Sequence, residues 1–110
     1  MARGDVLLVA LPVSDGREQS GRRPGVAVQT DITGELMLMV APITSNLKAL
    51  RFTFTVEVDP SAENGLDVPS VIMIFQMRSI DKGRIVRKIG SLSNEDLDQV
   101  DKEIWKMLKP

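Results

Sequence analysis

Residues 51–59, RFTFTVEVD, decide the fold class, because apolar and polar side chains alternate strictly along them. A period of two residues is typical of a β-strand that buries one face and exposes the other to water. The apolar face of this predicted strand would carry Phe52, Phe54, Val56 and Val58. This segment therefore predicts a half-buried strand and favours a β-rich fold.

Further short segments are rich in apolar and β-branched residues and predict more strands. Turn-forming residues, such as Thr33 followed by Gly34, separate them. A loop is expected over residues 60–65, and the chain turns again at 80–83. With 51–59, the predicted strands cover residues 5–12, 25–30, 35–43, 70–76 and 84–89.

The only clear helical pattern lies at the end of the chain. Ser93 is a good N-cap, and Asp96 follows three residues later in a capping-box arrangement. Glu95 and Asp96 place negative charge in the first turn, where the helix dipole favours it. We expect Trp105 to lie beside the apolar stripe and to pack against the strands. The residues that recur at helical spacing are Leu97, Val100, Ile104 and Leu108.

These elements predict a mainly β protein, a small β-barrel with a C-terminal α-helix, since closure of a barrel removes exposed strand edges. The 110 residues are close to the usual size of one domain, so residues 1–110 are expected to form a single domain. With 43% apolar and 26% charged residues, the composition is that of an ordinary globular protein.

The sequence contains neither Cys nor His. Their absence removes disulfides, thiolate nucleophiles, imidazole bases and the commonest metal ligands, so no cofactor and no metal site are expected. The N-terminal apolar run is too short to span a bilayer and does not resemble a signal peptide. We therefore expect a cytoplasmic protein that does not bind membranes.

Charge is distributed unevenly, although the net charge is only −1. Residues 95–103 are mostly acidic, whereas residues 78–88 are mostly basic. Both segments could simply be solvated faces. Alternatively, the basic segment joins Arg17, Arg22 and Arg23 in a phosphate-binding surface, and the acidic helix faces away from it. The basic residues of 78–88 are Arg78, Lys82, Arg84, Arg87 and Lys88.

The loop segment 18–24, EQSGRRP, concentrates a carboxylate, an amide and two guanidinium groups. Such side chains, together with a Thr hydroxyl, could support RNA cleavage by the neighbouring 2′-hydroxyl, because the substrate then supplies the nucleophile. An Arg fork suits the charged phosphate oxygens, and Thr adds a hydrogen-bond donor. Arg is a poor base, so on chemical grounds Glu18 is the candidate for proton removal.

Five segments, each a weak motif alone, occur together in an order and spacing that resemble the PemK/MazF family of toxins. The resemblance implies an SH3-like β-barrel, a homodimer and a metal-independent, sequence-specific endoribonuclease that cuts single-stranded mRNA. It also implies products with 2′,3′-cyclic phosphate and 5′-hydroxyl ends, and inhibition by a cognate antitoxin, which we expect to be acidic. The segments are RGDVLLVAL (3–11), EQSGRRP (18–24), VAPIT (40–44), QMRSIDKGRI (76–85) and IGSLSNEDLDQVDKEI (89–104).

Carried over residue by residue, the resemblance makes Arg23 and Thr44 the main catalytic candidates. Arg23 would handle the scissile phosphate and proton transfer, and Thr44 would stabilise the transition state. Arg22 would be a supporting charge that contacts the substrate.

Four more residues take lesser roles by the same resemblance. Gln19, Gln76 and Arg78 are expected to contact the substrate. Glu18 is expected to contact the substrate and is also a catalytic candidate, but the family emphasises Arg, so the identity of the proton acceptor stays open.

The sequence departs from many relatives at Leu7, where they carry an aromatic residue, and this affects packing more than chemistry. Residues 45–51 vary within the family and are expected to shape the sequence preference. Two other functions stay open on the same barrel, a gyrase-poisoning toxin or a non-catalytic RNA-binding protein. The gyrase hypothesis is disfavoured because Trp105 lies inside the predicted helix, whereas the related gyrase poisons use a terminal Trp.

Overall fold

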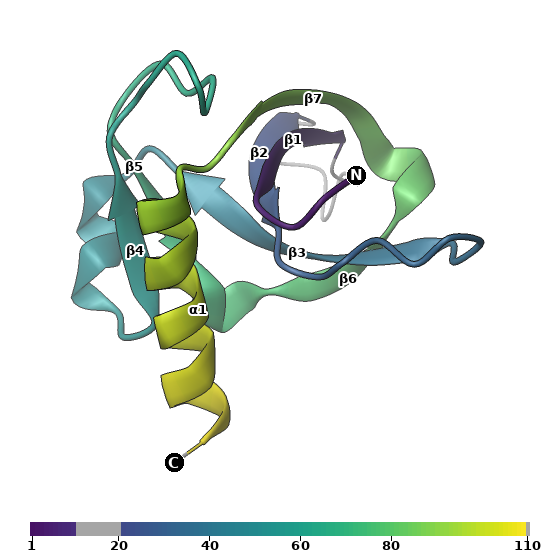
Figure 1. The fold of residues 1–110 in the computed structure, drawn as a ribbon. Coiled ribbons are helices and arrows are strands. Elements are labelled where there is room, and N and C mark those ends of the chain that lie inside the picture. Colours follow the sequence, from purple (N-terminus) through teal and green to yellow (C-terminus); the bar gives the residue numbers. More distant parts are fainter. Residues whose placement is uncertain (11–20, 110) are drawn as a thin grey trace.

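The computed structural model describes residues 1–10 and 21–109. Within them the chain is mainly β with one α-helix near its C-terminal end, as the sequence predicts (Figure 1). The elements, with η denoting 3₁₀ turns, are β1 (Asp5–Ala10), β2 (Arg22–Ala27), β3 (Met37–Thr44), η1 (Leu47–Arg51), β4 (Thr55–Val58), β5 (Ser70–Met73), η2 (Ile74–Gln76), β6 (Arg78–Asp81), η3 (Lys82–Arg84), β7 (Ile85–Ser91) and α1 (Asn94–Leu108).

The strands form one antiparallel, strongly curved sheet in the order β4-β5-β3-β2-β1-β7. Strand β3 is shared, because it pairs with β6, β2 and β5 at successive points along its length. Strands β1, β2 and β7 arch over β3 and β6 (Figure 1). Within the described residues no strand pair joins β4 to β7, so the curvature expected of a barrel is present but its closure is not.

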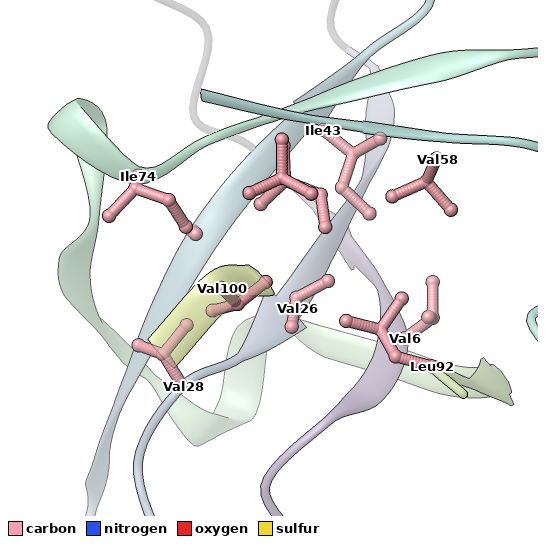
Figure 2. Packing of buried hydrophobic residues seen from close by; sticks show 11 residues of the cluster. Val6, Val26, Val28, Ile43, Val58, Ile74, Leu92 and Val100 are labelled. Atoms are coloured by element: carbon pink, nitrogen blue, oxygen red, sulfur yellow. The ribbon is translucent and has the colours of Figure 1, made fainter. Parts of the chain in front are cut away.

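Buried apolar side chains form two clusters against the sheet. The larger lies between the sheet and α1, and it gathers side chains from β1 to β5 and from the helix, including Val6, Ile43, Val58 and Val100 (Figure 2). The smaller is formed by β1, β2, β3 and β6 and contains Leu7, which is fully buried. Leu7 is therefore a core residue.

Strand β2 begins at Arg22, three residues earlier than the sequence pattern predicts. Arg23 lies opposite Val9 and Pro24 opposite Leu8 in the pairing with β1. Pairing with β3 starts only at Gly25, so the first part of β2 has a neighbour on one side alone. Such a local edge is where a sheet tolerates proline. The two adjacent arginines therefore belong to a strand rather than to a loop.

The alternating segment 51–59 is a strand only from Thr55 onward. Phe54 has a φ of 60°, which breaks the extended conformation, and its carbonyl accepts hydrogen bonds from the amides of Ile74 (3.0 Å) and Phe75 (3.3 Å). The predicted strand 70–76 correspondingly ends at Met73 and continues as η2. Both apolar runs are thus shorter as strands than predicted.

Helix α1 starts as predicted, with the Ser93 hydroxyl accepting a hydrogen bond from the Asp96 amide at 3.1 Å. The expectation for Trp105 is wrong, because its side chain is 64% exposed. Leu108 is similarly exposed, and Met107 packs against the core instead. With 100° between successive residues, Trp105 points well away from its neighbour Ile104 on the buried face. No helix in the described residues has the length and apolar character needed to cross a membrane.

Candidate functional site

Three clefts meet at Thr44, the last residue of β3. The first has a volume of about 590 Å³, and the second and third about 240 Å³ each. Arg23 and Pro24 line both the first and the second cleft, and Met73 lines both the second and the third. The three clefts are therefore neighbours on one part of the surface.

The second cleft brings together four residues that the sequence marks as site candidates. Arg23 comes from β2 and Thr44 from the end of β3. Gln76 ends η2, and Arg78 begins β6 opposite Val40 of β3. All four reach this cleft because β3 pairs with β2 on one side and with β6 and β5 on the other.

The Thr44 hydroxyl has a defined hydrogen-bonding state. Its Oγ1 accepts a hydrogen bond from the Asn46 amide at 3.1 Å. A hydroxyl has one proton and two lone pairs, so this contact uses one lone pair, and the proton has no acceptor among residues 1–10 and 21–109. Thr44 is thus both a structural acceptor at the end of a strand and a potential donor to a ligand.

The first cleft is bounded by arginines on one side and by the β4–β5 loop on the other. Arg22, Arg23 and Arg87 supply positive charge, and Asp67 of the loop supplies one carboxylate. The three arginines are part of paired strands β2 and β7, so their backbone positions are set by the sheet. The three guanidinium groups suit a polyanionic ligand, which could make one further polar contact with Asp67.

The β4–β5 loop is held firmly against β7. Asn64 is buried, and its side chain accepts hydrogen bonds from the amides of Ser61 (3.0 Å) and Leu66 (2.9 Å) and donates one to the Asp59 carbonyl (2.9 Å). The next residue is Gly65, with a φ of +72°, and an added Cβ would lie only 2.1 Å from a backbone oxygen of β7. The loop wall of the first cleft is therefore preorganised.

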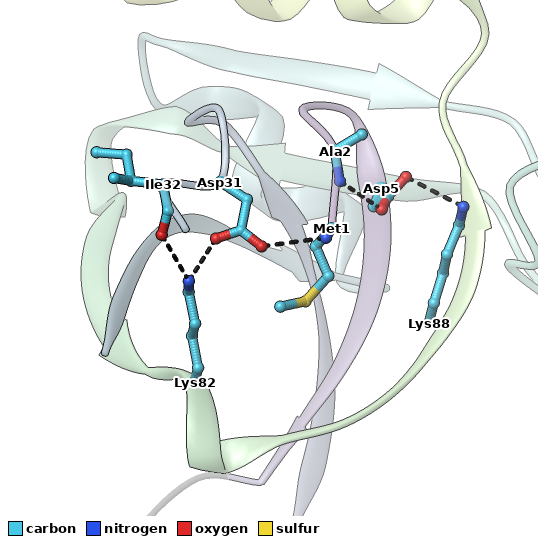
Figure 3. Close-up of polar contacts among 7 residues, drawn as sticks. All are labelled: Met1, Ala2, Asp5, Asp31, Ile32, Lys82 and Lys88. Atoms are coloured by element: carbon cyan, nitrogen blue, oxygen red, sulfur yellow. Dashed lines mark hydrogen bonds and ion pairs between the residues drawn. The ribbon is translucent and has the colours of Figure 1, made fainter. Parts of the chain in front are cut away.

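The basic segment 78–88 does not act as one surface. Arg78 and Arg87 line the clefts. Lys82 and Lys88 instead contact carboxylates elsewhere (Figure 3). Arg84 lines none of the three clefts. The hypothesis of a phosphate-binding surface thus applies to two of these five side chains.

The two lysines hold together the part of the sheet near the N-terminal end of the described chain. Lys82 pairs with Asp31, and Lys88 lies 3.3 Å from the buried carboxylate of Asp5 (Figure 3). The Lys82 ammonium, followed by the terminal ammonium of Met1, lowers the pKa of the Asp31 carboxyl. These pairs serve structure rather than the clefts.

Several cleft residues have no distinguishing signal in the sequence. Asp67 is one of many surface carboxylates until the loop places it among arginines. Lys48, Arg51 and Phe52 line the third cleft but carry no motif. Glu18 and Gln19, which the resemblance assigns to the site, lie outside the described residues, as does Arg17.

A family model described as the PemK-like, MazF-like toxin of type II toxin–antitoxin systems matches residues 2–108. The chain belongs to this family. Four residues that the family resemblance marks as site candidates lie together in the second cleft: Arg23, Thr44, Gln76 and Arg78.

Curated relatives agree with this assignment. The chain is 36% identical over 104 residues to "Endoribonuclease EndoA" of Bacillus subtilis (strain 168), covering 93% of this chain and 89% of the relative. It is also 36% identical over 106 residues to "Endoribonuclease MazF" of Staphylococcus saprophyticus, covering 94% of this chain and 88% of the relative. Both matches span nearly the whole of each protein.

Solved structures show the same fold. The Mycobacterium tuberculosis toxin MazF-mt6 superimposes with a TM-score of 0.75 at 23% identity, covering 94% of this chain and 95% of that one. A MazE–MazF structure from Deinococcus radiodurans gives a TM-score of 0.75 at 24% identity, covering 98% and 95%. The curved sheet with its helix is thus the fold of MazF-type toxins.

Proposed function

We propose that this toxin is a metal-independent, sequence-specific endoribonuclease that cuts single-stranded mRNA in the cytoplasm. Its relatives at 36% identity are endoribonucleases, which supports this activity over gyrase poisoning or RNA binding alone. The structural observation that carries the proposal is the convergence of Arg23 and Thr44 where the clefts meet.

In the proposed reaction, the 2′-hydroxyl oxygen attacks the adjacent phosphorus and the bond from phosphorus to the 5′-oxygen breaks. The 2′-hydroxyl loses its proton, and the leaving 5′-oxygen gains one. The products are a 2′,3′-cyclic phosphate and a 5′-hydroxyl. No oxidant, metal or covalent enzyme intermediate is required for this balance.

The protein contributes positioning and charge neutralisation. Arg23 binds the non-bridging oxygens of the scissile phosphate and takes part in proton transfer. Thr44 donates its free hydroxyl proton to the charge that develops in the transition state. The neighbouring nucleotides are contacted by Gln76, Arg78, Arg22 and Gln19. Glu18 is the chemical candidate for the proton acceptor.

The proposal includes two protein partners. One is a second copy of the chain, since the family resemblance implies a homodimer. The other is an acidic antitoxin whose extended segment would lie over the arginine-lined clefts and compete with RNA. Two complexes support such a partner, MazE–MazF from Deinococcus radiodurans and a mycobacterial endoribonuclease with its cognate antitoxin. Both are similar in fold to this chain.

The test is to incubate the purified protein with long RNA in the presence of EDTA and to map the cut ends. We expect cuts at one short sequence, with cyclic phosphate and 5′-hydroxyl termini. Arg23→Ala should lose cleavage while it retains the circular dichroism spectrum and oligomeric state of the wild type.

Arg22→Ala is the matched control, because it removes another exposed guanidinium from the adjacent position of the same strand. It should weaken binding and keep most of the cleavage rate. Full cleavage by a folded Arg23→Ala protein would refute the site assignment. Intact RNA together with trapped gyrase complexes would instead support the gyrase hypothesis.

A further inference from the structure

The third cleft contains an aromatic side chain that the fold does not bury. Phe52 is 44% exposed and lines this cleft together with Thr44, Lys48 and Arg51. An aromatic ring left open to water beside two cations has an unused binding surface. This cleft adjoins the second cleft, with which it shares Thr44 and Met73.

Both the backbone and the ring of Phe52 are held by neighbouring groups. The backbone amide of Phe52 donates to the Ala49 carbonyl at 3.0 Å, and the backbone carbonyl of Phe52 accepts from the Thr55 hydroxyl at 3.1 Å. Phe75 supports the ring from one side, with the ring centroids 5.2 Å apart and the planes tilted by 45°. The ring therefore needs little ordering when a ligand binds.

The Arg51 guanidinium lies over the Phe52 ring, with its Cζ 4.9 Å from the ring centroid. Arg51 is itself exposed. Because a nucleobase stacks on a guanidinium plane as it does on an aromatic ring, the Arg51 guanidinium backed by the Phe52 ring offers a stacking surface. Lys48 and Arg51 add positive charge for the phosphate that accompanies the base.

We propose that the third cleft is a nucleotide subsite in which one unpaired base of the RNA stacks on the Arg51 guanidinium that Phe52 supports. This inference rests on the proposed ribonuclease function and deepens it. The base belongs to a nucleotide near the scissile phosphate, because Thr44 lines both the third cleft and the cleft that contains Arg23. Stacking requires an unpaired base, so the subsite also selects single-stranded substrate.

The experiment combines abasic substitution in the RNA with mutation of Phe52. A short RNA centred on the mapped cut site carries a 2′-deoxynucleotide at the cut, which removes the nucleophile and allows equilibrium binding to be measured. An abasic nucleotide is then placed at each position in turn. For the wild type, one position should weaken binding by roughly 5- to 150-fold, the range expected for loss of one stacked base.

The Phe52→Ala protein should bind the intact RNA with a similar loss and should be nearly insensitive to the abasic nucleotide at that position. Phe52→Trp should keep both the affinity and the sensitivity. Phe52→Leu, which preserves apolar packing on Phe75, should behave like Phe52→Ala and separates stacking from a folding defect.

Trp105→Ala is the matched aromatic control. Trp105 is also exposed and also has a cation over its ring, with Lys109 Nζ 5.3 Å from the centroid, but it lies on α1 and lines none of the three clefts. RNA binding by Trp105→Ala should match the wild type. Lys48→Ala should lower the slope of log K against log salt by about 0.7, the value for one phosphate contact in a single strand.

Equal abasic penalties in the wild-type and Phe52→Ala proteins at every position would overturn the subsite. The proposed function fails separately, if the wild type cuts no RNA. In that case the abasic series is made in a short single-stranded RNA that the wild type binds, and coupling between Phe52 and one base would still support the subsite.

Discussion

Thr44 lines all three clefts, and within the described part of the chain its hydroxyl makes one hydrogen bond, in which it is the acceptor. The Asn46 amide occupies a lone pair of Oγ1, which fixes the oxygen while the proton stays available. A hydroxyl on a mobile side chain would have to be ordered in each catalytic cycle. Here the end of β3 and the start of η1 provide that order in advance.

We expect Thr44→Val to lower kcat by about 100- to 1,000-fold, the usual loss when one transition-state donor is removed. The substitution preserves shape, so KM should change little. Thr44→Ser retains the hydroxyl and should recover most of the rate. Single-turnover cleavage of a defined RNA distinguishes the two. An equal loss in both variants would show that the hydroxyl is not responsible for the effect, since Thr44→Ser retains it.

Asp67 is the one carboxylate that lines the first cleft within the described part of the chain. Its charge opposes phosphate binding by Arg22, Arg23 and Arg87. We therefore expect Asp67→Asn to bind RNA several-fold more tightly at low salt, with the gain fading as salt rises. Asp59→Asn changes an exposed carboxylate that lines none of the three clefts and should have no such effect. Filter binding across a salt series measures both.

The site residues differ in how far sequence alone could predict them. Arg23, Thr44, Gln76 and Arg78 stand in recognisable motifs, and the structure brings them to one cleft. Phe52 was expected on the buried face of a strand, because alternation is the only signal that its neighbours provide. Its exposure follows from η1 and from the positive φ at Phe54, which no periodicity reveals.

At the scale of elements, the rigid β4–β5 loop makes a wall of the first cleft from residues that have no strand or helix of their own. The buried Asn64 side chain bonds to three backbone groups there, and Gly65 approaches β7 too closely for any side chain. The shape of this cleft therefore depends on packing between a loop and a distant strand.

We expect Gly65→Ala to destabilise the protein by at least ~2 kcal/mol in total, which is more than Gly34→Ala. The reason is that Gly65→Ala adds a backbone clash to the cost of positive φ. Gly34 has a φ of +88° with nothing within 4 Å of an added Cβ, so its variant should lose only about 1–2 kcal/mol. Urea unfolding of both proteins gives the difference. Equal losses would show that the loop can move away from β7 without cost.

Predicted elements agree with the structure best where a local signal sets a boundary. Ser93 caps α1 as its sequence indicates. The start of β2 was missed by three residues, because Pro24 and two arginines are typical of loops and become a strand only through pairing with β1. Which strands neighbour β3 depends on contacts between distant segments, and sequence patterns carry no information on these.

At the scale of the whole molecule, one ion pair links the β2–β3 connection to η3 (Figure 3). The Lys82 ammonium lowers the pKa of the Asp31 carboxyl, so the folded state favours the charged form. This contribution to stability is fully present above the unfolded-state pKa of about 4 and is lost as pH falls through the lower folded-state pKa.

The stability difference between the wild type and Asp31→Asn should accordingly be constant near neutral pH and should shrink below about pH 4. Urea midpoints measured across that range test this. Glu57→Gln, which changes an exposed carboxylate on β4, should show no comparable loss at neutral pH. A difference from Asp31→Asn that persisted unchanged at low pH would rule out the ion pair as its cause.

The pairing of β1 with β7 joins Asp5 to Ser91 and Val9 to Ile85, so among the described strands the earliest in the chain pairs with the latest. Arg87 lies on that late strand and lines the first cleft. A nascent chain shorter than this point has Arg23 and Thr44 but lacks one wall of the site. Translation products that end before β7 should therefore be inert, and toxicity should require that β7 has been synthesised.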